Sequence, residues 1–556
     1  MMPVTQATSS QASLEPRAST NKQELGSAGL DRAIAVLIFF GCLAYLWLFR
    51  HFSSLEPDEG IVLQGATRIL SGQLPYRDFF SFYTPGSFYL VAGLFRVLGN
   101  SFLVARTSLA ATGALCSVIT YLLSRRVSSR GISIFVAILA TAVGAAFRFL
   151  VLHNCYSTLF ACLAVYSFVR LVEDPRFTWG FSTGSFVAVT FLIEQSKGGG
   201  LALGVILGLL LLRGTERSTK STVTALGTGL AWPFVLTFAY FGAHHAVGAM
   251  LSSWLWPLYH YTGANRVPYG WLNWSDSARN AIFRSGPWFV RVAKAIAISP
   301  GIVVAVLPLV AVGLLLYWAI RLQESENNPV ANYYVAVCSA LSGLLFSITI
   351  VRADILHFMY LAPLWYVVLA WILGAHSQPS NLLRKARPLL VLYTAAALGM
   401  LAFAMLLATT GAKNWIQTRR GDIKTREADN VIAYVQAHST AGETLLVYPY
   451  LPLYNYLTST KSPTRFDFFQ PGMNTPEQAE EIVKTLVAER TSTVLFEPWF
   501  AEKFANSWPG TPLAAIANDP VGAYIVHNFR VCRFLESPDQ WRFEYMVRRD
   551  MPCPRD

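Results

Sequence analysis

The sequence predicts an all-α polytopic membrane protein that carries a C-terminal α/β domain. Only 14% of the 556 residues are charged and 53% are hydrophobic, whereas soluble domains contain about 25% charged residues. Several apolar runs reach about twenty residues, which is the length of a membrane-spanning helix. The hydrophobicity falls near residue 412 and stays low to the end of the chain. A membrane domain followed by a polar domain accounts for these observations.

The N-terminal segment, residues 1–32, is polar and rich in Ser, Thr and Gln. This composition predicts a disordered cytoplasmic segment. The first apolar run follows it without the compact charged region and the small-residue cleavage site of a secretory signal peptide. A retained signal anchor is therefore expected.

The apolar runs between residues 33 and 411 predict about eleven transmembrane helices. Two long loops, 53–100 and 243–298, separate them on the outer side. Segment 180–212 is interpreted as two short spans with a turn at Gly198–Gly200, because a single helix would be far longer than about twenty residues. The predicted spans are 33–52, 101–123, 131–147, 154–171, 180–195, 199–212, 222–242, 299–320, 331–350, 357–375 and 388–410.

Basic residues in short loops predict the orientation of the chain in the membrane. The segments 125–130, 170–176, 213–220 and 384–387 follow even-numbered spans, and all of them carry Arg or Lys. The positive-inside rule places these loops in the cytoplasm and the C-terminal domain outside, in a multi-pass protein expected in a bacterial inner membrane. The same rule explains the net charge of +12 without nucleic acid as a partner. Further basic residues fall on the outer side, within a long loop and the C-terminal domain, where the rule is tolerant.

The polar C-terminal part, residues 412–556, has the pattern of a small extracytoplasmic α/β domain. Cys532 and Cys553 lie in it and could pair in an oxidising compartment, and no cysteine spacing in the chain is typical of a metal site. The predicted elements are helices over 428–438 and 475–489 and buried strands over 443–450 and 491–499.

Charged residues and histidines gather at the outer ends of the odd-numbered spans. Ionisable groups near a bilayer tend to line a polar cavity because burying them in lipid is costly. A single outer site that combines carboxylates with cations is therefore expected. Cations suit a phosphate, and a carboxylate suits a proton that must leave a hydroxyl group. The clusters are "EPDEG" (56–60), "FRFLVLHNCYS" (147–157), "EQSKGGG" (194–200), "HH" (244–245) and "VRADILH" (351–357).

Each candidate also has a structural interpretation that involves no chemistry. Asp58 and Glu59 could form an exposed loop pair or cap a helix that begins at Gly60. The other candidates could be interfacial, capping or mutually paired side chains, namely Arg352 with Asp354, His357, Lys197 and His153.

The stretch "PDEG" followed by "ILSGQLPYRDFFSFYTPGSFYLVAGLFRVLGNSFLVAR" resembles the GT-C membrane glycosyltransferases. The resemblance is to their protein-mannosyltransferase, aminoarabinose-transferase and RgtA/B/C/D-like branch. Its members have an acidic pair, a Gly- and Pro-containing aromatic stretch and an Arg in the second span. Here these are Asp58-Glu59, Gly72 to Gly86 and Arg106. The later segments "VRADILHF" and "YPYLPLYNYLTSTKSPTRF" also resemble motifs of related members.

This resemblance implies an enzyme that moves a sugar from a polyprenyl-phosphate donor to a lipid, glycan or protein acceptor at the outer membrane face. Asp58 is then the expected general base toward the acceptor hydroxyl, and Glu59 is expected to orient the acceptor or tune the base. The residues expected to bind the donor phosphate and sugar are Arg352, His357, Lys197, His153, Asp354 and Arg106.

The sequence differs from the pattern of this branch at two positions. Pro85-Gly86 replaces a common Pro-Pro pair, and His153-Asn154 stands where some relatives carry a second acid. The missing acid weakens the case for a two-carboxylate mechanism, so neither a metal nor another cofactor is expected, although a divalent metal stays open. The alternatives are a ligase or a transporter or flippase for lipid-linked glycans, and a catalytically silent scaffold. A transporter fits less well, because no internal repeat is visible and the acids lie at helix ends.

Overall fold

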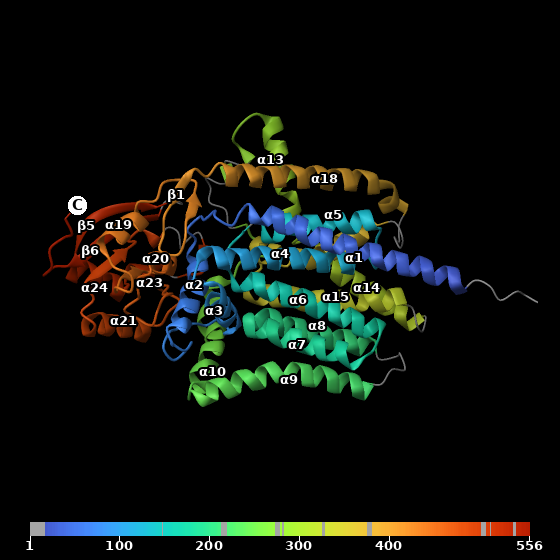
Figure 1. The fold of residues 1–556 in the computed structure, drawn as a ribbon, viewed down its shortest axis with the longest axis horizontal. Coiled ribbons are helices and arrows are strands. Elements are labelled where there is room, and N and C mark those ends of the chain that lie inside the picture. Colours follow the sequence, from blue (N-terminus) through green and yellow to red (C-terminus); the bar gives the residue numbers. More distant parts are fainter. Residues whose placement is uncertain are drawn as a thin grey trace, which may run out of the picture.

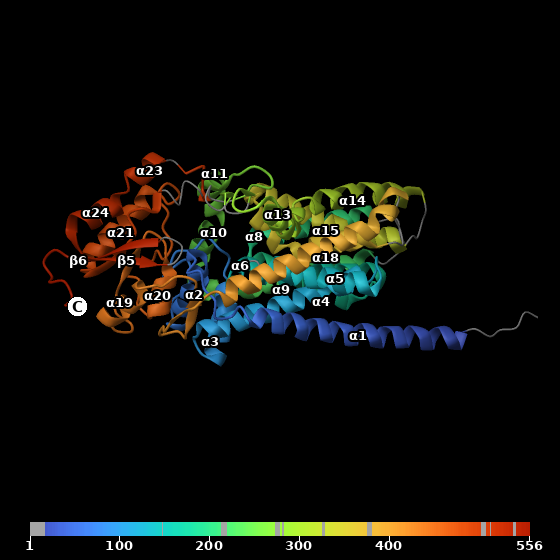
Figure 2. The same cartoon turned by 90° about the horizontal axis from the view of Figure 1, so that it is seen from above.

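The fold is described from a computed structural model of the chain. It covers residues 17–556 except 147, 213–218, 273–278, 281–282, 325–328, 375–380, 502–506, 512, 538–540 and 556. A long helical bundle carries a smaller domain at one end, and this smaller domain contains the C-terminus (Figures 1 and 2). The predicted fold class, a helical membrane domain with a C-terminal α/β domain, is confirmed.

Each predicted span overlaps a helix of the bundle, but the span predicted over 299–320 crosses the break between α13 (Trp288–Val303) and α14 (Leu307–Glu324), and that over 357–375 covers both α16 (Ile355–Tyr360) and α17 (Ala362–Leu373). The turn predicted at Gly198–Gly200 is wrong, because these glycines lie inside a helix and the break falls at Glu194. Within the described ranges, six helices are long and apolar enough to cross a membrane, and α13 (Trp288–Val303) with α14, bent by 43°, would make a seventh. The remaining apolar helices are shorter, and they include α17, most of whose side chains are buried in the bundle. The span helices are α1 (Arg17–Trp47), α4 (Phe102–Ser124), α5 (Arg130–Ala140) with a π-helical turn (Thr141–Ala145), α6 (His153–Glu173), α7 (Phe177–Ile193), α8 (Gln195–Leu211), α9 (Thr219–Ala243), α14 (Leu307–Glu324), α15 (Pro329–Val351), α17 (Ala362–Leu373) and α18 (Asn381–Thr410).

Helix α1 begins at Arg17, so the expectation of disorder through residue 32 is wrong for residues 17–32. Asp31 anchors the end of this segment to the bundle. Its carboxylate accepts a hydrogen bond from Tyr121 at 2.7 Å and pairs with Arg130 at 2.8 Å. These contacts tie the polar turn of α1 to α4 and α5. Residues 1–16 lie outside the described part of the chain.

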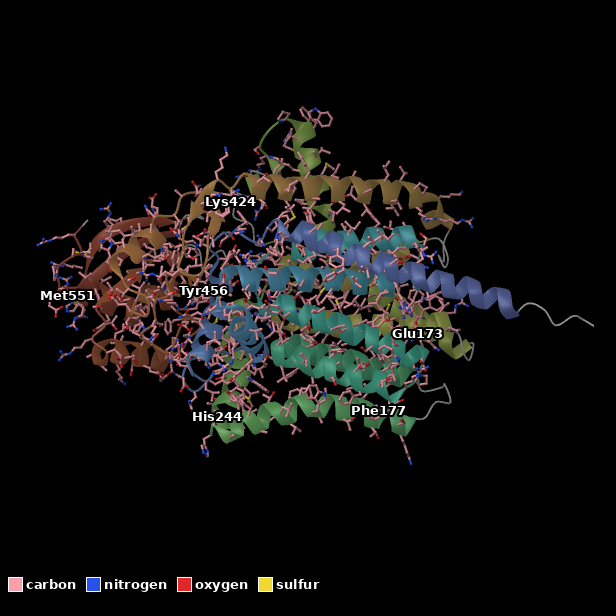
Figure 3. All side chains as sticks on the ribbon, viewed as in Figure 1. Glu173, Phe177, His244, Lys424, Tyr456 and Met551 are labelled. Carbon is pink, nitrogen blue, oxygen red and sulfur yellow. A yellow bond between two sulfur atoms is a disulfide. The ribbon has the colours of Figure 1, made fainter. Side chains whose placement is uncertain are left out.

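The basic segments 125–130 and 170–176 lie at one end of the bundle, as predicted. Arg126 and Glu173 form an ion pair at 2.5 Å across this end. Glu173 lies far from His244 and from the C-terminal domain, which are at the other end (Figure 3). Most of the predicted basic loop 213–220 falls outside the described residues.

The two long loops are largely helical. Loop 53–100 contains α2 (Pro57–Leu70) and α3 (Gly86–Leu98). These helices and α10 (Val247–Trp256) lie between the bundle and the C-terminal domain (Figures 1 and 2). Loop 243–298 contains α10 (Val247–Trp256), a π-helical turn (Pro257–Tyr261), α11 (Thr262–Asn265) and most of α13, and a short α16 (Ile355–Tyr360) follows α15.

The C-terminal domain is built on a four-stranded mixed sheet in the order β3-β4-β6-β5, with β3 and β4 parallel. The helices predicted over 428–438 and 475–489 and the strands predicted over 443–450 and 491–499 are present. Cys532 and Cys553 form a disulfide. The elements are β1 (Asn414–Ile416), β2 (Ile423–Thr425), α19 (Val431–His438), β3 (Leu446–Tyr448), α20 (Pro452–Thr458), α21 (Pro476–Ala488), β4 (Thr493–Phe496), α23 (Leu513–Ala517), α24 (Pro520–Asn528), β5 (Phe529–Ser537) and β6 (Trp541–Arg548).

The C-terminal domain docks on the first long loop, and this contact places α2. Gly60 of α2 allows the closest approach, because a Cβ there would lie 2.1 Å from the backbone nitrogen of Leu453. Further along α2, Arg68 pairs with Asp467 at 2.8 Å. The start of α2, which carries Asp58, is thereby held between the bundle and the outer domain.

Candidate active site

A cavity of about 1370 Å³ lies at the end of the bundle that faces the C-terminal domain. The polar ends of the predicted first, third, fifth and ninth spans meet here, as the sequence predicted. Tyr450 and Trp508 of the C-terminal domain complete the wall. His244 and His245 do not line this cavity. Its polar lining includes Glu56, Asp58, Arg148, His153, Asn154, Glu194, Arg352, Asp354, His357 and Tyr360.

Asp58 stands in the first turn of α2, and its side chain is 34% exposed toward the cavity. The Nη2 of Arg148 lies 3.1 Å from Asp58 Oδ2 and 2.9 Å from Glu56 Oε2. Burial raises the pKa of Asp58, and the charge of Arg148 offsets this only in part, while Glu56 adds to the rise. A carboxylate with a raised pKa is a better proton acceptor than an ordinary aspartate.

Glu59 does not lie beside Asp58 in the cavity, so its predicted placement is wrong, and the same holds for Arg106. Successive helical residues point about 100° apart, so Glu59 faces the interior when Asp58 faces the cavity. Glu59 is fully buried, pairs with Arg106 at 2.6 Å and accepts a hydrogen bond from the Val151 amide at 2.9 Å. Arg106 also donates to the Phe149 carbonyl. This buried pair fixes the backbone on both sides of the Asp58–Arg148 contact.

Arg148 is a site residue that the sequence reasoning missed. It lies within the quoted cluster 147–157, where only His153 and Asn154 were considered. Its Nη1 donates to the Tyr360 hydroxyl at 3.0 Å, and its Nη2 contacts the two acids of α2 and its cap. An arginine directly after an apolar span, at the same membrane end as Asp58, was the signal in the sequence.

Arg352, Asp354 and His357 form one cluster on the cavity wall. Asp354 pairs with Arg352 at 2.5 Å, contacts His357 Nδ1 at 2.6 Å and caps α16. The pairing of Arg352 with Asp354 was anticipated as a structural alternative, whereas the cap was not, and the residues nevertheless line the cavity. Burial would raise the pKa of Asp354, but His357 and Arg352 outweigh it and hold this pKa well below its usual range. Asp354 is therefore a permanent anion that orients two potential phosphate ligands.

Arg352 also joins the membrane domain to the outer domain. Its guanidinium donates to the Asn265 side chain at 2.6 Å and to the Ser507 carbonyl at 2.7 Å. The strongest predicted phosphate ligand is thus held by protein groups on several sides, whereas Arg148 lies directly beside the proposed base.

Lys197 lies behind the cavity wall instead of on it, which corrects its predicted place among the donor ligands. It is buried, and its Nζ pairs with Glu194 at 2.8 Å and donates to Ser157 at 2.7 Å. Glu194 does face the cavity, as does His153, whose ring centroid lies 4.1 Å from that of Tyr83. Glu194 was within a quoted cluster but was not singled out from the sequence.

Part of the cavity lining is apolar and exposed. Exposed apolar side chains are normally scattered on a soluble surface, but here six of them belong to the lining of one cavity. They come from α8, α10, the turn after α10, and α15, and all of them belong to the cavity lining: Leu203, Leu251, Leu255, Leu258, Phe346 and Ile350.

The fold and the cavity define a polytopic membrane protein with a charged site at one end of the bundle and exposed apolar side chains in its lining. The structure is similar to that of ArnT from Cupriavidus metallidurans bound to undecaprenyl phosphate, with a TM-score of 0.53 and 13% identity over 95% of this chain and 99% of that chain. The apo state of the same protein gives a TM-score of 0.50 and 13% identity over 94% of this chain and 98% of that one. At this identity the likeness shows a shared fold, the GT-C architecture.

The sequence also matches a family model over part of its length. Residues 83–241 match the model described as dolichyl-phosphate-mannose-protein mannosyltransferase. This segment includes Arg148, His153 and Glu194 of the cavity wall. No curated protein matches the chain.

Proposed function

We propose that the protein is an integral-membrane glycosyltransferase that transfers a sugar from a polyprenyl-phosphate donor to an acceptor hydroxyl. The observation that carries this proposal is the composition of the cavity described above. Its polar part holds an acid–cation pair, Asp58 and Arg148, and its lining also includes exposed apolar side chains. A substrate with a phosphorylated sugar head and a hydrocarbon tail fits both parts.

The exposed apolar side chains of the lining support a lipid substrate. Each CH₂ group of a polyprenyl tail that is buried in an apolar environment stabilises the bound state by about 0.8 kcal/mol. The tail can therefore remain in the bilayer next to the exposed leucines while the head group enters the cavity. The similar ArnT structure is bound to undecaprenyl phosphate, and the matched family is named for a dolichyl-phosphate sugar. Both names agree with a lipid-phosphate donor for this chain.

The chemistry follows from the charges in the polar part of the cavity. Asp58 accepts the proton of the acceptor hydroxyl as the oxygen of that hydroxyl bonds to the anomeric carbon of the sugar. The bond between the anomeric carbon and the phosphate oxygen breaks at the same time, and its electron pair leaves with the lipid phosphate. Arg148, Arg352 and His357 stabilise the charge on this leaving phosphate. A single displacement of this kind inverts the anomeric configuration.

We expect the reaction to need no divalent metal. Among the described residues there is no group of three or more His, Cys, Asp and Glu side chains that could hold a metal ion. The acids of the cavity wall are engaged with protein cations: Glu56 and Asp58 with Arg148, Asp354 with Arg352, and Glu194 with Lys197. Turnover should therefore continue in excess EDTA, and a loss that Mg²⁺ or Mn²⁺ restores would contradict this expectation.

We place the cavity and the C-terminal domain on the extracytoplasmic side of a bacterial inner membrane. The Arg-containing segments 125–130 and 170–176 lie at the opposite end of the bundle, in agreement with the positive-inside rule. The Cys532–Cys553 disulfide agrees with an oxidising compartment. Protease added to intact spheroplasts should cleave a tag at the C-terminus, and cleavage only after lysis would contradict the orientation.

The proposal is tested with the purified protein and a panel of polyprenyl-phosphate sugars, with membranes of the producing bacterium as the source of acceptor. Asp58→Asn should lower the release of polyprenyl phosphate by at least about 100-fold, as expected for loss of a general base. The same variant should keep its affinity for the sugar-linked lipid.

Asp174→Asn is the matched control, because Asp174 is also paired with an arginine but lies at the other end of the bundle. This variant should turn over at the wild-type rate. Undiminished turnover in Asp58→Asn, or a wild-type protein that binds none of the lipids, would overturn the proposed function. Export of intact donor across a vesicle membrane without sugar transfer would instead favour the flippase alternative.

A further inference from the structure

Glu194 is a cavity carboxylate that the proposed proton transfer does not use. It stands at the break between α7 and α8, where the chain is extended, and its side chain is 14% exposed. This small exposed part belongs to the cavity lining. A buried ion pair contributes little net stability, so stability alone does not explain why a charged residue stands at this position.

Three side chains hold this carboxylate in one orientation. Its Oε2 lies 2.8 Å from Lys197 Nζ and accepts a hydrogen bond from Ser157 Oγ at 2.6 Å. In the amide orientation that satisfies its neighbours, Asn154 donates to Oε2 at 2.7 Å and to Oε1 at 3.0 Å. A carboxylate fixed before the ligand arrives loses little side-chain entropy on binding.

The charge of Glu194 is balanced within the wall itself. Lys197 is buried directly behind it and neutralises it. The pair therefore presents hydrogen-bond acceptors to the cavity without a net negative charge. Such a surface suits neutral hydroxyl groups and gives no special advantage to an ammonium group.

An aromatic surface lies beside the carboxylate. The Tyr83 ring stands against the His153 ring, and Gln195 donates to the Phe82 carbonyl at 3.1 Å, which ties this wall to the start of α8. Burial raises the pKa of Tyr83, and Tyr83 and Glu194 line the same cavity. A flat apolar face next to a fixed acceptor matches the two kinds of surface on a sugar ring.

We propose that Glu194 binds the sugar of the donor by accepting hydrogen bonds from its hydroxyl groups, and that it helps to select which sugar is transferred. This inference rests on the proposed glycosyltransferase function and adds a sugar-recognising group to it. A carboxylate placed to accept a hydrogen bond from a sugar hydroxyl discriminates against analogues that lack this hydroxyl, because one of its oxygen atoms would then lack a hydrogen-bond donor.

The test compares two dissociation constants in the full-length protein: one for sugar-free polyprenyl phosphate and one for the polyprenyl-phosphate sugar that the wild type turns over. Glu194→Gln should weaken binding of the sugar-linked lipid about 10-fold or more, the effect expected for losing a hydrogen bond to a charged group. Binding of the sugar-free lipid should change less than about twofold. Glu173→Gln, at the other end of the bundle, is the matched control and should alter neither constant.

Equal weakening of both lipids would mean that Glu194 only supports the cavity wall, and unchanged binding of both would also overturn the proposal. Because Glu194→Gln leaves the buried Lys197 without its partner charge, Glu194→Gln/Lys197→Met is made as a second variant with no orphaned ion. It should show the same selective loss. A wild-type protein that binds neither lipid would instead refute the underlying glycosyltransferase function, and the two failures are thereby told apart.

Discussion

The Glu59 carboxylate lies 2.6 Å from the Arg106 guanidinium, and both side chains are buried beneath the cavity floor. Glu59 directly follows Asp58 in the chain, and Arg106 donates to the carbonyl of Phe149, which directly follows Arg148. One buried ion pair therefore sets the backbone of both partners in the Asp58–Arg148 contact. The two adjacent acids therefore have different roles: Asp58 faces the cavity, and Glu59 holds the backbone of Asp58 in place.

This arrangement predicts that Glu59→Gln lowers the stability of the protein and alters the position of Asp58. It would leave the buried Arg106 charge uncompensated and lower the free energy of unfolding by about 3–5 kcal/mol. Thermal unfolding in detergent checks this. The double variant Glu59→Leu/Arg106→Met, which removes both charges, should recover most of the stability but not the activity. Full activity in the double variant would contradict the positioning role.

The acid limb of the pH–rate profile should report Asp58. A general base works only when deprotonated, so turnover falls as the pH drops below its pKa. Because burial raises the pKa of Asp58 above that of an ordinary aspartate, the fall should begin at a higher pH than an ordinary aspartate would give. The measurement is kcat/KM against pH with a saturating acceptor source. A rate that is flat down to pH 4 would argue against Asp58 as the base.

Arg148→Met should weaken the binding of the lipid phosphate and raise the pKa of Asp58. Loss of the guanidinium should weaken binding of polyprenyl phosphate about 10-fold or more, since a charged hydrogen bond is worth about 1.5–3 kcal/mol. Loss of its positive charge should also move the acid limb to still higher pH, because Arg148 lowers the pKa of Asp58. Arg176→Met, at the opposite end of the bundle, is the control for loss of an arginine. An acid limb that stays in place would show that the two residues do not interact in solution.

The Cys532–Cys553 disulfide closes a segment with a sequence separation of 21 at the C-terminal edge of the outer domain. Its removal in Cys532→Ser/Cys553→Ser should lower the free energy of unfolding by about 3 kcal/mol, the value typical of a loop of this size. A comparison of the melting temperatures of the oxidised wild type and the double variant checks this. Addition of a reductant should lower the melting temperature of the wild type and leave that of the double variant unchanged.

Local patterns in the sequence were sufficient for the architecture. Hydrophobic length located the spans and indicated two short helices in segment 180–212, although their break lies at Glu194 and not at Gly198–Gly200. Helical and strand patterns located the elements of the C-terminal domain. These features depend on short-range properties, namely the thickness of a bilayer and the periodicity of side chains, so a single sequence contains them. The same reasoning brought Asp58, Arg352, Asp354, His357 and His153 to one end of the bundle.

The chain by itself thus determined that charged helix ends would meet at one membrane face. The tertiary structure decided which of those charges face the cavity. Glu59 and Arg106 turn inward as a buried anchor, Lys197 lies behind Glu194, and Arg148 emerges as the partner of Asp58. The rotation of each helix and the partner of each buried charge depend on residues far apart in sequence, because an ion is tolerated inside the protein only where another element supplies its counter-charge.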